Sequence, residues 1–295
     1  MQQVLITGGT GLIGRHLVEK LSDNYKVTVV SRDPTRATRL LGDQAQAVKL
    51  DSLVDLDDYH AIINLAGEPI ADKRWTDNQK QRICSSRWDI TKKLVELINA
   101  SVHKPKVFIS GSAIGVYGRQ GDTPINEDFK EFHEEFSREV CAKWEEIALK
   151  AETRVCLLRT GVVLDEDGGA LAKMLMPFRL GLGGPISDGK QYMSWIHIED
   201  MIRGITFLLE NEQCTGPYNL TSPNPNTNAF FSIKLASRLE RPCMFRVPSF
   251  VIKTLMGESS DLVLFGQKVI PQRLMSSGFN FTYPTLEEAL GALDL

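Results

Sequence analysis

Close to its start, the chain reads Val4-Leu5-Ile6-Thr7-Gly8-Gly9-Thr10-Gly11-Leu12-Ile13-Gly14, an apolar run that ends in a glycine-rich turn. The pattern predicts a β-strand, a turn and a helix over residues 12–21. Gly8 permits a sharp turn after the strand, Gly11 lets the main chain approach a pyrophosphate, and Gly14 lets the helix pack closely on the strand. The free N–H groups at the helix start favour an anion. This stretch therefore predicts a dinucleotide-binding turn.

Alternating strand and helix patterns follow. The expected strands are 26–31, 47–50, 61–65, 106–110 and 154–160, and the expected helices between them include 78–100 and 131–151. This alternation predicts an α/β fold with a doubly wound parallel sheet. In such sheets the ligand lies across the carboxyl ends of the strands. Those ends carry Gly8, Ser31-Arg32, Leu65-Ala66-Gly67, Ser110-Gly111-Ser112 and Thr160-Gly161.

The composition of the chain changes after Gly161, where glycines and then prolines become frequent. We expect residues 1–165 to form the dinucleotide-binding domain, with residues 195–220 returning to its sheet, and residues 166–295 to form a smaller C-terminal substrate lobe. Two late segments, 250–256 and 285–293, have helical patterns.

The composition is that of an ordinary globular protein. Of the 295 residues, 42% are hydrophobic and 24% are charged. The net charge is −3, whereas a nucleic-acid-binding protein usually carries an excess of positive charge. No apolar run has the ~20 residues needed to span a bilayer, and the first strand leaves no room for a signal peptide. The five cysteines have neither metal-site nor redox-motif spacing. We therefore expect a cytoplasmic protein without a metal, a membrane or a nucleic-acid partner.

The end of the second strand bears on which nucleotide binds. Strands of this kind that bind NAD usually end in Asp or Glu, which holds the ribose 2′-hydroxyl. Here Ser31-Arg32 stands there, and a hydroxyl beside a guanidinium suits a 2′-phosphate. The position favours NADP. The alternative is that Arg32 faces solvent and Asp33 takes the ribose.

Several motifs together resemble the extended short-chain dehydrogenase/reductase superfamily, in particular its atypical epimerase-family proteins of the bacterial YfcH type. They are ITGGTGLIGRHL, INLAGEPIADKRW, SSRWDITKKLVELI, LLRTGVVL, MPFRLGLGGPI, WIHIEDM and GQKVIPQRL, and they span nearly the whole chain. The resemblance implies a Rossmann-like domain, a small C-terminal substrate lobe and NADP as cofactor. The residues expected at the cofactor are Gly8, Thr10, Gly11, Leu12, Ile13, Gly14, Ser31, Arg32, Leu65, Ala66, Gly67, Arg87 and Val162. For Arg87, a surface charge pair is the alternative.

The usual catalyst of that superfamily, a Tyr-x-x-x-Lys pair on the helix after the fifth strand, is missing. Aligning on Lys143 puts Glu139 at the tyrosine position. Aligning on Glu145 instead puts Ser137 at the tyrosine position and Cys141 at the lysine position. Neither register supplies a phenol to transfer a proton beside the nicotinamide. The resemblance therefore implies an altered active site.

Two residues near the fifth strand are the candidate catalytic groups. The run Ser110-Gly111-Ser112-Ala113-Ile114-Gly115-Val116-Tyr117-Gly118 resembles the family's Ser-Ser-x-x-Val-Tyr-Gly with one residue inserted. Ser112 would polarise a substrate oxygen and Tyr117 would carry the proton. The alternatives are a strand-end serine that caps main chain and a structural tyrosine. Among other candidates, Glu139, Lys143 and Glu145 have the spacing of a solvated helix face, Cys141 is expected in the core, and His197 in a structural hydrogen bond.

The substrate itself is not identified by the sequence. The segment 176–185 could cover a pocket, with Arg179 meeting an anion and Gln191, Tyr192 and Trp195 lining it. Two hypotheses follow for the whole chain. It is an NADP-dependent oxidoreductase or nucleotide-sugar-epimerase-like enzyme acting on a small molecule, or a non-catalytic NADP-binding sensor or interaction protein.

Overall fold

A seven-stranded parallel sheet forms the centre of the molecule, and the computed structural model describes residues 1–295. The strand order is β11-β7-β5-β4-β1-β2-β3. The bounds are β1 Gln3–Thr7, β2 Lys26–Val30, β3 Gln46–Val48, β4 Tyr59–Asn64, β5 Val107–Ala113, β7 Arg154–Thr160 and β11 Gly216–Leu220. The order reverses between β1 and β4, and ligands bind at such a switch point. The Rossmann-like α/β fold expected from the sequence is confirmed.

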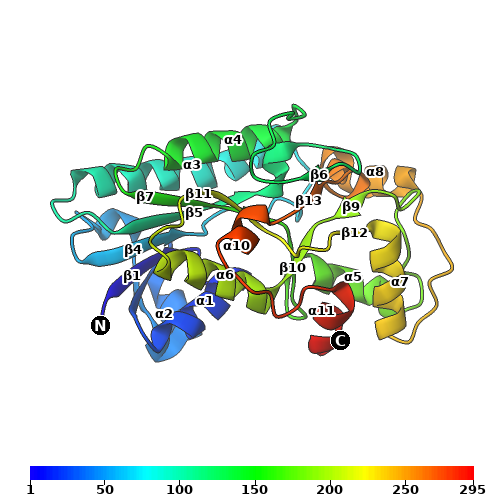
Figure 1. Ribbon diagram of the computed structural model, residues 1–295, viewed down its shortest axis with the longest axis horizontal. Helices are drawn as coiled ribbons and strands as arrows, with labels where there is room; N and C mark the ends of the chain where they lie inside the picture. Colours follow the sequence, from blue (N-terminus) through cyan, green and yellow to red (C-terminus); the bar gives the residue numbers. More distant parts are fainter.

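Helices cover both faces of this sheet (Figure 1). One layer contains α3 (Asp77–Ala100) and α4 (Phe136–Ala148), and the other contains α1 (Leu12–Ser22), α2 (Pro34–Leu41) and α6 (Ile198–Glu210). Side chains of one strand alternate between the two layers. Val4 and Ile6 belong to the core cluster that includes α1 and α6, whereas Leu5 between them belongs to the cluster under α3. β1 is therefore buried on both faces, which explains its near-continuous apolar run.

A smaller lobe lies beyond the carboxyl ends of the strands (Figure 1). Its own core of 12 buried residues includes Trp195, Phe178 and Phe231. The elements are β8 (Val162–Leu164), α5 (Gly169–Arg179), β9 (Tyr192–Met193), β10 (Trp195–His197), β12 (Asn226–Thr227), α7 (Asn228–Arg238), α8 (Ser249–Met256), α9 (Asp261–Leu264), β13 (Lys268–Val269) and α11 (Leu286–Ala292). Between the last two, α10 (Gln272–Ser276) packs its buried Leu274 into the core of the central sheet. β10 pairs with β8 inside the lobe, and β6 (Pro124–Ile125) pairs with β13. β11, which lies between β10 and β12 in the sequence, belongs to the central sheet, so the chain crosses between the two parts more than once.

The expected helix over residues 131–151 begins later than the sequence pattern indicates. α4 starts at Phe136, with Glu135 in an extended conformation before it. Upstream of it, the ring centroid of Phe132 lies 6.5 Å from that of Tyr117 and 6.3 Å from that of Phe129. This aromatic packing holds the preceding segment as a loop against the end of β5. No helix of the protein combines the length and apolarity that crossing a membrane requires.

His197 fixes the start of α6 inside the structure. Its Nδ1 accepts a hydrogen bond from the Glu199 N–H at 3.1 Å, and its ring centroid lies 4.0 Å from that of Tyr283. Its Nε2 is buried without a partner, and burial lowers the pKa of the imidazole. The histidine therefore has the structural role that the sequence favours.

A pH dependence of stability follows from this lowered pKa. Below the ordinary histidine pKa of about 6.5, the unfolded chain binds a proton that the folded His197 does not, so the free energy of unfolding falls as the pH drops further. We expect His197→Asn, which keeps a capping acceptor, to flatten this dependence. Urea unfolding at pH 7.5, 6.5 and 5.5 measures it. His103→Asn, at a side chain 82% exposed, is the control and should retain the wild-type slope.

Candidate functional site

At Gly8 and Gly14, the glycine turn after β1 has no room for side chains. Gly8 has a φ of +71°, and a Cβ there would lie 2.6 Å from the Leu65 carbonyl oxygen. A Cβ on Gly14 would lie 2.2 Å from the Gly8 oxygen, so this glycine packs α1 against the turn itself rather than against the strand. A Cβ on Gly11 would lie 3.2 Å from its nearest neighbour, the Gly8 oxygen. Gly8 and Gly14 therefore shape the turn, and Gly11 forms its exposed outer surface.

The N-terminus of α1 opens onto this turn without a side-chain cap. Gly11 is the N-cap residue, and the first turn carries no acidic side chain. The N–H groups of Leu12 and Ile13 are among the first four of the helix and have no intrahelical acceptor. Unpaired N–H groups and the positive dipole end together attract an anion. The turn can therefore hold a diphosphate.

A buried hydrogen-bond chain fixes the neighbouring loop at the end of β4. The Thr7 hydroxyl donates to Asn64 Oδ1 at 2.6 Å, and Asn64 Nδ2 donates to Thr91 Oγ1 at 2.8 Å. The Ala66 N–H donates to Thr7 Oγ1 at 3.2 Å, which ties the Leu65-Ala66-Gly67 loop to β1. Sequence reasoning missed Thr7, Asn64 and Thr91 as supports of the site. The available signal was the polar residue at the end of two otherwise apolar strands.

Arg87 points from α3 toward the same loop. Its Nη1 donates to the carbonyl oxygens of Glu68 at 3.0 Å and Ile83 at 3.1 Å. A Cβ on Gly67 would lie 2.9 Å from the Arg87 guanidinium carbon, and that carbon lies 5.3 Å from the centroid of the Trp144 ring. Burial lowers the pKa of the guanidinium. Arg87 is thus an inward-facing cation beside the loop and not part of a surface ion pair.

At the end of β2, Asp33 is engaged as a helix cap. Its carboxylate accepts from the Arg36 N–H at 3.0 Å and so begins α2. The Ser31 hydroxyl donates to the Asp33 carbonyl at 3.0 Å and accepts from the Asp33 N–H at 3.1 Å. Arg32 is exposed and forms no ion pair. The guanidinium of Arg32, and not the carboxylate of Asp33, is therefore free to meet a ligand here.

The lobe meets the glycine turn where β7 ends. A Cβ on Gly161 would lie 2.4 Å from the Ser194 oxygen, and the Val162 N–H donates to that oxygen at 2.8 Å. Further on, a Cβ on Gly168 would lie 2.9 Å from a methyl group of Leu12. The start of α5 thus lies beside the start of α1, whereas the half-buried Val162 packs against the core of the lobe.

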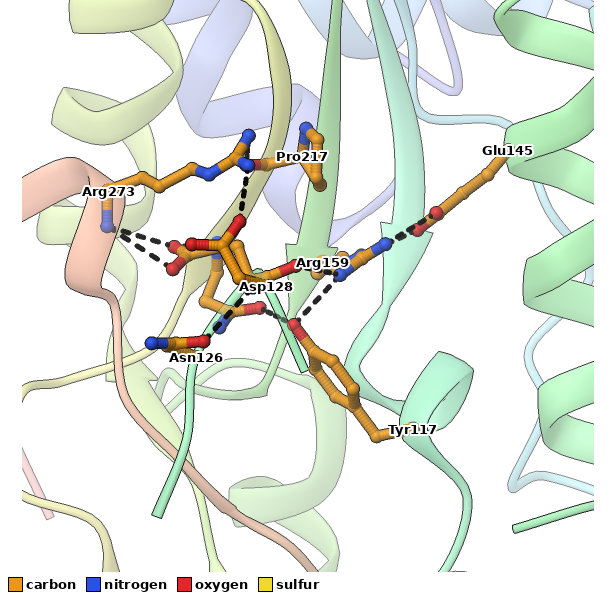
Figure 2. A network of polar contacts seen from close by, with 9 residues as sticks. Tyr117, Asn126, Asp128, Glu145, Arg159, Pro217 and Arg273 are labelled. Carbon is orange, nitrogen blue, oxygen red and sulfur yellow. Dashed lines mark hydrogen bonds and ion pairs between the residues drawn. The ribbon is translucent and has the colours of Figure 1, made fainter. Parts of the chain in front are cut away.

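Ser112 lies buried at the end of β5, beside a polar network in which Figure 2 shows Glu145, Arg159 and Tyr117. Its hydroxyl donates to Glu145 Oε1 at 2.7 Å. The same carboxylate accepts two hydrogen bonds from Arg159, at 2.9 and 2.8 Å. Arg159 also donates to the Tyr117 hydroxyl at 3.0 Å, and that hydroxyl donates to Asn219 Oδ1 at 2.7 Å. The network joins β5, α4, β7 and β11.

This network determines the roles of Tyr117 and Glu145. The hydroxyl of Tyr117 is fully buried and bound on both sides, and burial raises the pKa of Tyr117 to about 12. This position gives the phenol no route to a substrate and favours the structural alternative. Glu145 was expected on a solvated face, and that is wrong, because the carboxylate is buried against the guanidinium of Arg159.

The face of α4 that replaces the Tyr-x-x-x-Lys pair lies against the loop after β5. A Cβ on Gly115 would lie 3.3 Å from Ser137 Cβ and 3.6 Å from Cys141 Sγ. Both side chains are buried, and burial raises the pKa of Cys141 to about 12. The thiol therefore stays protonated and supplies no charge of the kind that a lysine would. Neither Glu139 nor Lys143, both exposed, lies on this face.

Cationic residues of the dinucleotide domain hold the lobe in place. The Trp75 and Phe136 ring centroids lie 4.9 Å apart, and Lys80 Nζ lies 5.1 Å from the Phe136 centroid. Lys80 forms a 2.7 Å ion pair with Glu258, and Arg74 donates to the last carbonyls of α8. These contacts join the start of α3 and the loop before it to α8 and to Glu258.

Of the residues expected to line the substrate pocket, two are engaged within the lobe. Gln191 donates to the carbonyls of Ile186 at 3.2 Å and Val263 at 3.0 Å. Trp195 is buried and donates to Asn226 at 2.8 Å, whereas Arg179 is exposed.

Comparison with known proteins places this geometry in a family. A model of the NAD dependent epimerase/dehydratase family matches residues 4–221, and a domain of unknown function (DUF1731) matches residues 247–293. An epimerase family protein of Staphylococcus epidermidis is 36% identical over 297 residues, covering 99% of both chains. The chloroplastic SDR39U1 homolog of Arabidopsis thaliana is 38% identical over 98% of this chain and 86% of its own. The structure of human epimerase family protein SDR39U1 with NADPH has a TM-score of 0.90 at 34% identity, covering 98% of both chains.

Proposed function

Since the chain belongs to the NAD dependent epimerase/dehydratase family, we propose that it is an NADP-dependent oxidoreductase or epimerase-like enzyme with an altered active site. The observation that carries the proposal is the turn at Gly8, Gly11 and Gly14, which presents the uncapped N-terminus of α1 at the switch point of the sheet. The human relative that was crystallised with NADPH supports the same cofactor.

The residues at this edge of the sheet fit an NADP molecule. The glycine turn and the N–H groups of Leu12 and Ile13 would hold the diphosphate, and Arg32 would hold the 2′-phosphate, while the Ser31 hydroxyl stays bound to the Asp33 carbonyl. The fixed Leu65–Gly67 loop, Arg87 and Val162 would bound the remainder. When bound, NADP supplies the donor or acceptor of a hydride.

The role that we propose for Ser112 is to orient the substrate. Its proton is donated to Glu145, which Arg159 holds as a carboxylate, so only the lone pairs of the Ser112 oxygen remain free. The hydroxyl can therefore accept a hydrogen bond from a substrate O–H or N–H but cannot donate one to a carbonyl. Tyr117 has no part in this proposal because its hydroxyl already donates to Asn219 and accepts from Arg159.

Arg32→Ala is expected to lower the preference for NADPH over NADH by roughly tenfold or more, because a charge-assisted bond to a phosphate is lost. A thermal-shift titration with NADPH, NADP⁺, NADH and NAD⁺ measures this, since a ligand at a hundredfold excess over its Kd stabilises the fold by about 2.7 kcal/mol. Arg246→Ala, an exposed arginine in the lobe, is the control. Equal shifts with NADH and NADPH in the wild-type chain would remove the argument from Ser31-Arg32.

The altered helix face favours one second candidate, a non-catalytic NADP sensor. Neither register of α4 places a tyrosine on the helix, and the one that aligns on Glu145 puts Ser137 and Cys141 at the tyrosine and lysine positions, so the usual proton donor is absent. Incubating the protein and NADPH with a panel of aldehydes, ketones and nucleotide sugars separates the two functions. An enzyme consumes NADPH or epimerises a sugar. A sensor does neither and binds the reduced and oxidised coenzymes with clearly different affinities.

A further inference from the structure

A serine and a carboxylate form a tight pair at the start of α4. The Ser137 hydroxyl donates to Glu135 Oε1 at 2.5 Å, in the short range for an O–H···O⁻ bond. The other carboxylate oxygen accepts from Arg119 Nε at 3.2 Å and lies 3.8 Å from His133 Nδ1. An ionised carboxylate can only accept, so the direction of the Ser137 bond is fixed.

A continuous string of contacts places this pair at the carboxyl edge of the sheet. It begins at Gly67, which lies against Arg87. The Arg87 guanidinium in turn lies 5.3 Å from the centroid of the Trp144 ring on α4, and one turn before Trp144 the helix presents Cys141, whose Sγ would lie 3.6 Å from a Cβ on Gly115. One turn earlier on α4, Ser137 faces the loop after β5 at Gly115. The pair therefore stands on the helix face where the tyrosine would otherwise be.

The lobe helps to hold Glu135. Arg119 bridges the Glu135 carboxylate to Asp261 of α9, at 2.8 Å, and its guanidinium lies 4.1 Å from the centroid of Phe265. The guanidinium keeps one oxygen of Glu135 in place while the other faces Ser137. Both domains thus contribute to the geometry of the pair.

We propose that Ser137 contacts the reacting oxygen of the substrate and that Glu135 takes up the proton behind it, in place of the Tyr-x-x-x-Lys pair. This inference rests on the proposed NADP-dependent function. The balance is that of an alcohol oxidation. The carbon loses a hydride to the coenzyme, the oxygen loses its proton to Ser137 Oγ, and the Ser137 proton passes to Glu135 Oε1. Reduction of a carbonyl is the reverse. In the oxidising direction Glu135 accepts the proton, and in the reducing direction it returns the proton through Ser137.

The placement has a consequence that needs no substrate to measure. The oxidised nicotinamide is a cation and the reduced ring is neutral, so a carboxylate near the ring favours NADP⁺. We expect Glu135→Gln, which keeps an acceptor for Ser137, to weaken NADP⁺ binding relative to NADPH by roughly fivefold. Calorimetric titration of both coenzymes gives the ratio. Glu134→Gln, at a neighbouring side chain 80% exposed, should leave the ratio unchanged, as should Ser137→Ala, which keeps the carboxylate.

Each outcome supports or overturns either the Ser137–Glu135 assignment or the proposed NADP-dependent function. A ratio for Glu135→Gln within twofold of the wild-type ratio overturns this assignment and leaves the proposed function intact. A ratio that Ser137→Ala shifts equally indicates a general disturbance of α4 and also overturns it. A wild-type chain that binds neither coenzyme overturns the proposed function itself. Loss of NADP⁺ preference in Glu135→Gln alone supports the assignment.

Discussion

Gly11→Ala is expected to lower the affinity for NADPH at least about a hundredfold, which corresponds to about 2.7 kcal/mol. Gly11 has a negative φ, and the new methyl group would lie 3.2 Å from the Gly8 carbonyl oxygen, a close contact that a shift of a few tenths of an ångström relieves. The methyl group also occupies the exposed surface where main chain must approach a diphosphate. Fluorescence titration with NADPH measures the affinity, and thermal unfolding without coenzyme measures the stability.

The control for this substitution is Gly121→Ala, an exposed glycine with no atom within 4 Å of a built Cβ. It should bind NADPH as the wild-type chain does. Unchanged binding by Gly11→Ala would show that no phosphate sits against the turn. A Gly11→Ala chain that is also strongly destabilised would mean that the glycine serves the fold and not the ligand.

Arg159→Met is expected to destabilise the folded chain by about 3 to 5 kcal/mol, because it leaves the buried Glu145 carboxylate without its counter-ion. The change also removes a donor from the Tyr117 hydroxyl, so two buried polar groups lose partners. Urea unfolding followed by circular dichroism measures the loss.

Two further variants distinguish a buried charge from a general packing effect. The double variant Glu145→Leu with Arg159→Met removes both charges and should recover much of the lost stability. Lys150→Ala breaks an exposed pair with Glu146 and should leave the unfolding transition nearly unchanged. If the double variant were as unstable as Arg159→Met alone, the uncompensated carboxylate would not be the cause.

The dinucleotide-binding edge was predictable because its signals are local. The turn at residues 8–14 is one continuous motif, and the apolar runs around it set the parallel strands. The capping role of Asp33 was not predictable, since the sequence allows the carboxylate to face either α2 or a ribose. The contact made by Gly14 also differs from the expected one, because its near neighbours are Gly8 and Gly9 of the turn and not the residues of β1.

The polar network under the site was missed because its members come from distant segments. Glu145 sits in a charged run of α4, and nothing local separates it from its exposed neighbour Glu146. The one available signal was Arg159, a guanidinium within the apolar run of β7, which requires a buried partner. The pairing of Ser137 with Glu135 was hidden in a similar way, because the sequence pattern places the helix start before Phe136, where α4 begins.

The central claim is that a dinucleotide lies across the carboxyl edge of the sheet, with its diphosphate against the start of α1. Electron density from crystals grown with NADPH tests it most directly. The account predicts phosphate oxygens within hydrogen-bond distance of the Leu12 and Ile13 N–H groups, with the 2′-phosphate beside Arg32. Density that leaves this turn empty at saturating NADPH, or that places the coenzyme in the hollow between Ile202, Phe207 and Phe279, would contradict it.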